Sequence, residues 1–158
     1  FRGSNGQTVA FRITGYQFPA DTSGGWDANW LRVYVRVETE AGSRESVDPS
    51  LTTWELARLA GWFGELSRGG TPQLRELTFT EPDLGFRLLE KGPGVVRQVR
   101  IAFDRDWDLV SGKEGGRVFM DMAADSGELA RIARELNEEL EKFPERRPAG
   151  QQLPGQPG

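Results

Sequence analysis

The chain has 158 residues, the size of one ordinary domain, and it contains neither cysteine nor histidine. The lack of cysteine excludes disulfide bridges, thiolate zinc sites, iron–sulfur ligation and cysteine nucleophiles. The lack of histidine excludes Ser-His-Asp hydrolysis and His-ligated metals. The formal net charge of −4 argues weakly against a nucleic-acid partner, and no apolar stretch is long enough to span a bilayer. Because the first twenty residues also lack a signal-peptide pattern, we expect a cytoplasmic protein with no membrane partner.

Two strands are predicted near the start of the chain, each with one buried and one wet face. Apolar and polar side chains alternate over 8–14 and more regularly over 30–39. Ala41-Gly42-Ser43 then predicts a hairpin into a short strand near 44–47.

Two amphipathic helices are predicted, each from a cap followed by an apolar stripe. Thr52 and Glu55 fit a capping box, in which a hydroxyl and a carboxylate each satisfy an orphan backbone donor. Gly69-Gly70 ends this helix. Asp125 is placed to cap the second helix, and Pro144 ends it.

Between the helices, alternation predicts three or four further strands, near 77–80, 86–89, 98–103 and 118–122. Consecutive antiparallel strands with two helices predict an α+β fold. We expect an antiparallel β-sheet of about six to seven strands with both amphipathic helices packed on one face.

The chain is expected to form a single α+β domain over residues 1–144. Residues 145–158 are rich in Pro, Gly and Gln and show no periodicity, so they predict a disordered tail.

A polar loop over 104–116 carries Asp104, Asp106 and Asp108 at alternate positions, as at the start of a calcium loop. Such a loop needs glycine at its sixth position and a carboxylate at its twelfth, where this chain has Leu109 and Gly115. An ordinary solvated loop is favoured, and no metal and no other cofactor is expected.

Paired carboxylates are the remaining route to catalysis without histidine, as in glycoside hydrolysis. Glu81 and Asp83 flank a proline at a predicted turn, and Asp48 and Glu55 bracket the start of the first helix. Turn and cap roles explain all four side chains, so we expect no enzyme.

The predicted wet face of the sheet combines arginines with an aromatic side chain, a composition typical of single-strand nucleic-acid binding. Its residues are Arg12, Arg32, Arg36, Arg100 and Tyr34. Acidic residues such as Glu38 and Glu45 dilute this patch. A solvated face is therefore favoured, with no nucleic acid as a partner.

Trp26 and Trp107 stand in predicted loops beside acidic residues. Exposed aromatic side chains next to acids are typical of protein-binding surfaces, but core packing explains them about equally well. For Trp30, Trp54 and Trp62, core packing is the default interpretation.

Four motifs occur in order, and a helix ending in Phe143-Pro144 follows them. They are GYQFP at 15–19, DANWL at 27–31, LTTWEL at 51–56 and FTEPDL at 79–84. This string resembles the WapI-like family of small bacterial proteins, described as immunity proteins against the toxic C-terminal domains of WapA-type wall-associated Rhs/YD-repeat proteins. The chain departs from the family pattern at Arg44, where an aromatic residue is common, and at Ser50, where cysteine is expected.

The resemblance implies a bacterial immunity protein that binds a cognate polymorphic toxin domain, commonly a nuclease, and neutralises it by direct protein–protein contact. A mildly acidic inhibitor agrees with this, since nuclease domains tend to be basic and charge complementarity speeds association. The alternative is a non-enzymatic protein-interaction domain of the same fold with an unrelated cytosolic partner.

Within the immunity hypothesis, the expected partner-binding residues lie in three loops. They are Trp26, Asp27, Asn29, Glu81, Asp83, Asp106 and Trp107. Of these, Asn29 and Glu81 have the strongest structural alternative, as polar residues that tie loops to the sheet through backbone hydrogen bonds.

Overall fold

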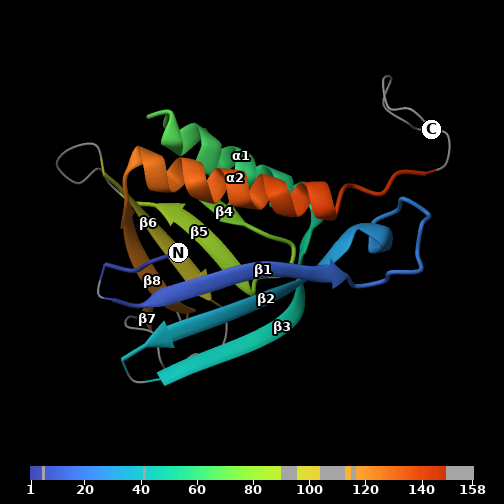
Figure 1. Ribbon diagram of the computed structural model, residues 1–158, viewed down its shortest axis with the longest axis horizontal. Coiled ribbons are helices and arrows are strands. Elements are labelled where there is room, and N and C mark those ends of the chain that lie inside the picture. The colour runs from blue at the N-terminus through green and yellow to red at the C-terminus, as the bar shows by residue number, and fades with distance from the viewer. Residues whose placement is uncertain (5, 41, 90–95, 104–112, 115–116, 149–158) are drawn as a thin grey trace.

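The computed structural model describes residues 1–148 apart from 5, 41, 90–95, 104–112 and 115–116, and Figure 1 shows how its elements are arranged. In chain order these are β1 (Thr8–Tyr16), the 3-10 helix η1 (Asp27–Asn29), β2 (Trp30–Thr39), β3 (Gly42–Thr52), α1 (Thr53–Ser67), β4 (Glu76–Thr78), β5 (Leu84–Leu88), β6 (Arg97–Phe103), β7 (Lys113–Glu114), β8 (Arg117–Ala124) and α2 (Ser126–Lys142). The predicted α+β class is confirmed.

The strands form two antiparallel sheets, in the orders β1-β2-β3 and β4-β5-β6-β8-β7, so the prediction of one sheet is wrong. The physical reason is that β3 runs directly into α1, which carries the chain away before the later strands pair with one another. Alternation of apolar residues fixes which face of a strand is buried, but it does not say which strand lies beside it.

β3 is longer than the short strand expected near 44–47, because it continues through Pro49 to the start of α1. A proline has no N–H for the ladder, and it is tolerated here because β3 is an edge strand with a register shift between Leu31 and Arg32 of β2. The pairing of Trp30 with Thr52 places the start of β2 next to the start of α1. This junction positions the candidate site.

The helices begin where the caps predict. The Thr52 hydroxyl accepts from the Glu55 backbone N–H at 3.3 Å, and the Glu55 carboxylate accepts from the Thr52 N–H at 2.8 Å. At α2, the Asp125 carboxylate accepts from the Glu128 N–H at 2.8 Å. Both capping predictions are confirmed.

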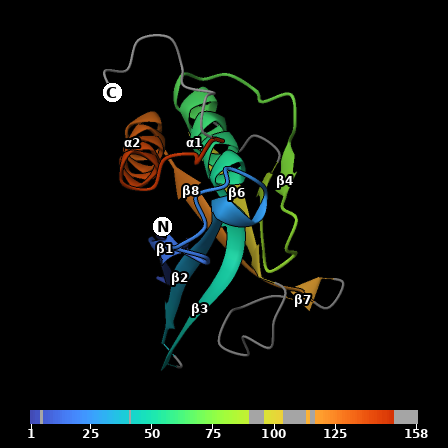
Figure 2. The same ribbon diagram turned by 90° about the vertical axis from the view of Figure 1, so that its right-hand side faces the viewer.

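α1 and α2 lie side by side above the strands in both views (Figures 1 and 2). One hydrophobic cluster includes residues of both helices and both sheets, with Leu59 and Leu129 among the helical residues and Val33 and Ile101 among the strand residues. The expected packing of both helices on one face stays a prediction, whereas the single sheet that it assumed is replaced by two. What the structure provides is one core, which gives the loops at the β2–α1 junction a rigid support.

Candidate functional site: a tryptophan patch at the sheet–helix junction

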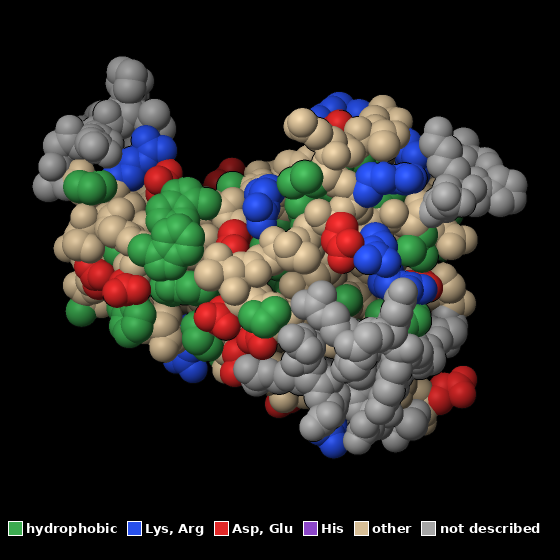
Figure 3. Space-filling model, turned by 180° about the vertical axis from the view of Figure 1, so that it is seen from behind, with side chains coloured by type: hydrophobic (Ala, Val, Ile, Leu, Met, Phe, Trp, Pro, Cys, Tyr) green, Lys and Arg blue, Asp and Glu red, His purple; other side chains and the backbone are tan. Residues whose placement is uncertain are grey.

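Trp26, Trp30 and Trp54 form a cluster that we call the tryptophan patch. The ring of Trp26 lies 5.3 Å from that of Trp54 and 6.4 Å from that of Trp30, centroid to centroid. The side chain of Trp26 is 54% exposed, and the other two are half-buried. On the face seen in Figure 3, hydrophobic side chains gather in one region, with acidic side chains beside them.

The patch joins three parts of the chain that are separate in the sequence. Trp26 precedes η1, Trp30 begins β2, and Trp54 lies in the first turn of α1. Sequence reasoning treated Trp30 and Trp54 as core residues and so missed two members of the patch. The only available signal was that each stands at the start of an element, where side chains lie at the rim of a core rather than inside it.

Glu145 forms the acidic border of the patch. Its carboxylate accepts a hydrogen bond from Trp54 Nε1 at 2.8 Å and lies 2.7 Å from the Arg147 guanidinium. These two contacts, the Trp54 hydrogen bond first, lower the pKa of the Glu145 carboxyl. Residue 145 is also the first of the expected disordered tail, yet Glu145 is held against α1 by this bond.

Asp27 and Asn29 follow Trp26 in η1 but have different environments. Asp27 is exposed beside the patch, whereas Asn29 is fully buried. Asn29 Nδ2 donates to the carbonyls of Gly25 and Arg146, and its Oδ1 accepts from Thr53 Oγ1 and from the Arg146 N–H. Every hydrogen-bonding position of this amide is used inside the protein. Asn29 therefore holds the patch in place and presents nothing to a partner.

The turn that carries Glu81 and Asp83 is fastened to the same end of α1. The Glu55 carboxylate accepts from the backbone N–H of Thr80 at 2.7 Å, and Glu55 is the neighbour of Trp54 in the chain. Glu81 is exposed and Asp83 partly exposed. Asp106 and Trp107 lie outside the described residues.

The arginines do not all lie on one sheet, which corrects the expectation of a common wet face of a single sheet. Arg100 lies on β6 of the second sheet, where it pairs with Asp121 at 2.8 Å. On the first sheet, Arg36 lies 2.6 Å from Glu38, and the Tyr34 hydroxyl donates to Glu45 at 2.8 Å. Carboxylates thus engage side chains that a nucleic-acid strand would need.

Two further features are absent from the part of the chain that the structure describes. It contains no group of three or more acidic side chains placed to hold a metal ion. Nor does any of its helices have the length and apolar character needed to cross a membrane.

Comparison with known proteins returned one family. A search among curated proteins gave no match to the chain. The family model described as "Immunity protein WapI-like family" matches residues 1–144, which include the whole tryptophan patch and both helices. The chain therefore belongs to the WapI-like immunity protein family.

Proposed function

We propose that this chain is a bacterial cytoplasmic immunity protein that binds a cognate toxin C-terminal domain and neutralises it by direct contact, without catalysis. The observation that carries the proposal is the family match over residues 1–144, which contain the exposed Trp26. The tryptophan patch is the contact surface in this proposal.

The patch has the physical character of a binding hot spot. Tryptophan is among the residues that contribute most to protein–protein association, because a large rigid ring loses much water contact and little conformational freedom. Trp26 packs against Trp54 and Trp30, so a partner meets a preformed aromatic surface. Preorganisation of this kind lowers the cost of association.

Acidic side chains border the patch and suit a basic partner. Asp27 is exposed next to Trp26, and the chain carries a net charge of −4. A nuclease toxin is a fitting partner, because enzymes that bind polyanionic nucleic acids tend to present positive surfaces. In this proposal Asp27, Glu81 and Asp83 contribute from the described surface, and Asp106 and Trp107, which lie outside the described residues, stay part of the prediction.

The experiment is a protection assay in bacteria. A candidate cognate toxic domain is expressed with the wild-type chain, with Trp26→Ala, or with Leu74→Ala. Leu74 is the matched control because it is a large hydrophobic residue with the same 54% exposure outside the patch. We expect protection by the wild type and by Leu74→Ala, and loss of protection with Trp26→Ala.

Binding is measured in parallel by calorimetry with the purified chain and an inactive form of the toxic domain. Truncation of a hot-spot tryptophan costs about 2–4 kcal/mol, which corresponds to roughly 30-fold to 1,000-fold in Kd. If the wild-type chain neither binds nor protects, the immunity proposal is wrong. If Leu74→Ala weakens binding as much as Trp26→Ala does, the tryptophan patch is not the specific contact surface.

The alternative is a non-enzymatic interaction domain with another cytosolic partner. A tagged chain recovered from a lysate of the source cell distinguishes the two, with and without nuclease treatment. A toxin C-terminal fragment that persists after nuclease treatment supports immunity. Unrelated proteins without any toxin fragment support the alternative, and partners lost on nuclease treatment indicate a nucleic-acid bridge.

A further inference from the structure

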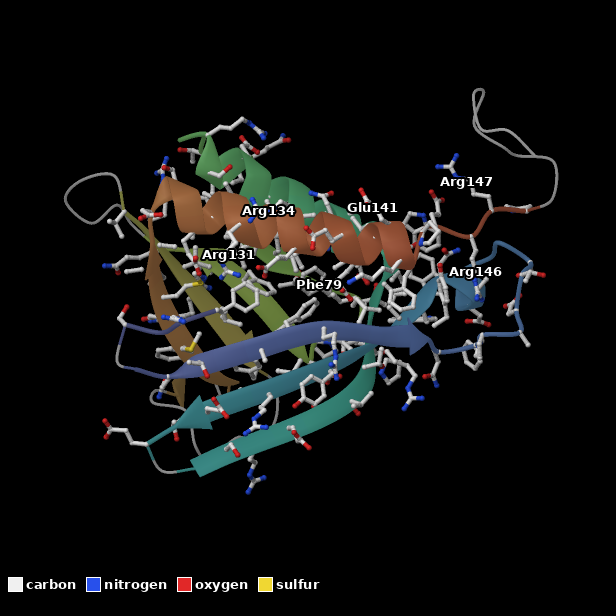
Figure 4. All side chains as sticks on the ribbon, viewed as in Figure 1. Phe79, Arg131, Arg134, Glu141, Arg146 and Arg147 are labelled. Carbon is white, nitrogen blue, oxygen red and sulfur yellow. The ribbon has the colours of Figure 1, made fainter. Side chains whose placement is uncertain are left out.

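The C-terminal segment, residues 144–148, crosses the connection between β1 and β2 after α2 has ended. Figure 4 shows Arg146 directed toward this connection, whereas the neighbouring Arg147 points away from it. The segment begins where the family match stops, at residue 144. The residues that follow Pro144, Arg146 among them, therefore lie beyond the part of the chain that the family model matches.

The guanidinium of Arg146 binds backbone carbonyls on the β1–β2 connection. Nη1 donates to Phe18 O at 2.9 Å and to Asp21 O at 2.6 Å, and Nη2 donates to Pro19 O at 3.1 Å. The same group lies 3.6 Å from the centroid of the Tyr16 ring, at the end of β1. A planar fork with several donors can hold such a turn, and a single ammonium cannot match all of these directions at once.

The backbone of Arg146 and the side chain of Glu145 bind residues in and next to the tryptophan patch. The Arg146 N–H donates to Asn29 Oδ1 at 2.8 Å, and Asn29 Nδ2 donates back to Arg146 O at 2.9 Å. Asn29 Nδ2 also binds Gly25 O at 2.9 Å, immediately before Trp26. One residue earlier, Glu145 accepts from Trp54 Nε1. Residues 145 and 146 thus link Trp54 on α1 to the backbone next to Trp26.

Gly24 shows how closely the segment approaches the connection. A Cβ at Gly24 would lie 2.1 Å from the backbone nitrogen of Pro148, a distance that no real contact allows. Gly24 also has a φ of +75°, which favours glycine on its own account. The C-terminal segment can take this position only because residue 24 has no side chain.

We propose that Arg146 is a positioning residue for the tryptophan patch: it fixes the connection from Phe18 to Gly25 and so sets the geometry that a partner meets. The proposal rests on the proposed function in one respect, namely that the patch is the partner-binding surface. Arg146 itself contacts the connection and not the partner.

The first test measures amide hydrogen exchange in the full chain, for peptides covering residues 17–29. We expect exchange there to rise at least about tenfold in Arg146→Ala and by less in Arg146→Lys, with α2 unchanged. Arg147→Ala is the matched control, since this neighbouring arginine pairs with Glu145 and should leave exchange in 17–29 unchanged. Unchanged exchange in Arg146→Ala would overturn the proposal.

The second test approaches the contact from the other side, with Gly24→Ala and Gly69→Ala. Gly69 is the matched control because its φ of +78° gives the same backbone strain, while nothing lies within 4 Å of the added Cβ. We expect faster exchange over residues 17–29 in Gly24→Ala alone. Equal effects of the two substitutions on this peptide would mean that general destabilisation of the fold, and not the displaced segment, is the cause.

The third test separates positioning from mere stability, using the inactive toxic domain at a temperature where every variant is folded. Arg146→Ala is expected to weaken binding at least about tenfold, with partial recovery in Arg146→Lys. Wild-type affinity in a variant whose connection exchanges faster would overturn the positioning role. If the wild-type chain itself does not bind, the proposed function fails, and the exchange rates alone decide whether Arg146 fixes the connection.

Discussion

The Glu55 carboxylate binds Thr80 through one oxygen while it caps α1 through the other. Oε1 accepts from the backbone N–H of Thr80 at 2.7 Å and from its hydroxyl at 2.9 Å, and Oε2 accepts from the Thr52 N–H at 2.8 Å. A single side chain therefore joins the start of α1 to the connection between β4 and β5. Glu55 therefore caps α1 and also cross-links the end of β3 in the first sheet to the β4–β5 connection of the second.

Glu55→Ala should destabilise the protein more than loss of an ordinary cap. The buried carboxylate satisfies backbone donors of both Thr52 and Thr80, so its removal is expected to cost about 3 kcal/mol in the free energy of unfolding. Urea denaturation of the variant measures this cost. Glu138→Ala, at an exposed position of α2, should stay within about 0.5 kcal/mol of the wild type. A similar small cost for Glu55→Ala would contradict the cross-link.

Asn29→Ala should be strongly destabilising although it removes few atoms. Asn29 is fully buried, and its loss leaves the Arg146 N–H and the Thr53 hydroxyl without this acceptor. We expect a cost of about 2–4 kcal/mol, because buried donors without partners keep their full desolvation penalty. Asp27→Ala, two residues away and exposed, is the control and should change the stability little.

Arg100 and Arg87 make a matched pair of strand arginines that should differ in their contribution to stability. Both pair with a carboxylate, but the Arg100 side chain is 21% exposed and lies 3.7 Å from the Phe119 ring centroid, whereas that of Arg87 is 44% exposed. Arg100→Ala should cost about 1–2 kcal/mol and Arg87→Ala less than about 0.5 kcal/mol. Thermal unfolding followed by circular dichroism tests this order, and the reverse order would be inconsistent with it.

The contact between Trp54 and Glu145 should weaken in acid. The Trp54 hydrogen bond and the Arg147 guanidinium lower the pKa of the Glu145 carboxyl below its ordinary value of 4.5. A carboxylate with a depressed pKa stabilises the folded state above its unfolded pKa, and this contribution is lost as the pH falls through the folded pKa. We expect the Trp54 Nε1–H NMR signal to shift in that window, below pH 4.5. In Glu145→Gln this transition should be absent.

The local elements could be predicted because their signals are local. The strand expected over 30–39 coincides with β2, and Thr52, Glu55 and Asp125 mark the helix starts where the structure has them. Each of these signals acts over a few residues, through alternation or through a side chain that satisfies its own helix end. The division into two sheets depends on which strands pair, and no single strand carries that information.

The candidate site was only partly accessible to the same reasoning. Trp26 and its acidic neighbour Asp27 were among the expected partner-binding residues, with core packing of Trp26 left open. For Asn29, the hydrogen bonds support the structural alternative. Arg146 was missed because its partners are backbone carbonyls more than a hundred residues away in the chain. Carbonyls are present at every residue, so no sequence pattern marks the three that a guanidinium will reach.

The two hydrogen bonds between Asn29 and Arg146 also bear on how a fragment of this protein should be chosen. A fragment that stops at residue 144, where the family match ends, would keep every helix and strand that the structure describes but lose Arg146 and Glu145, which bind Asn29 and Trp54. Its circular dichroism spectrum would look native, although the connection before Trp26 would have lost its hydrogen bonds to Arg146. Failure of such a fragment to protect cells would reflect the position of the cut, and a fragment must extend at least through residue 146 to keep these hydrogen bonds.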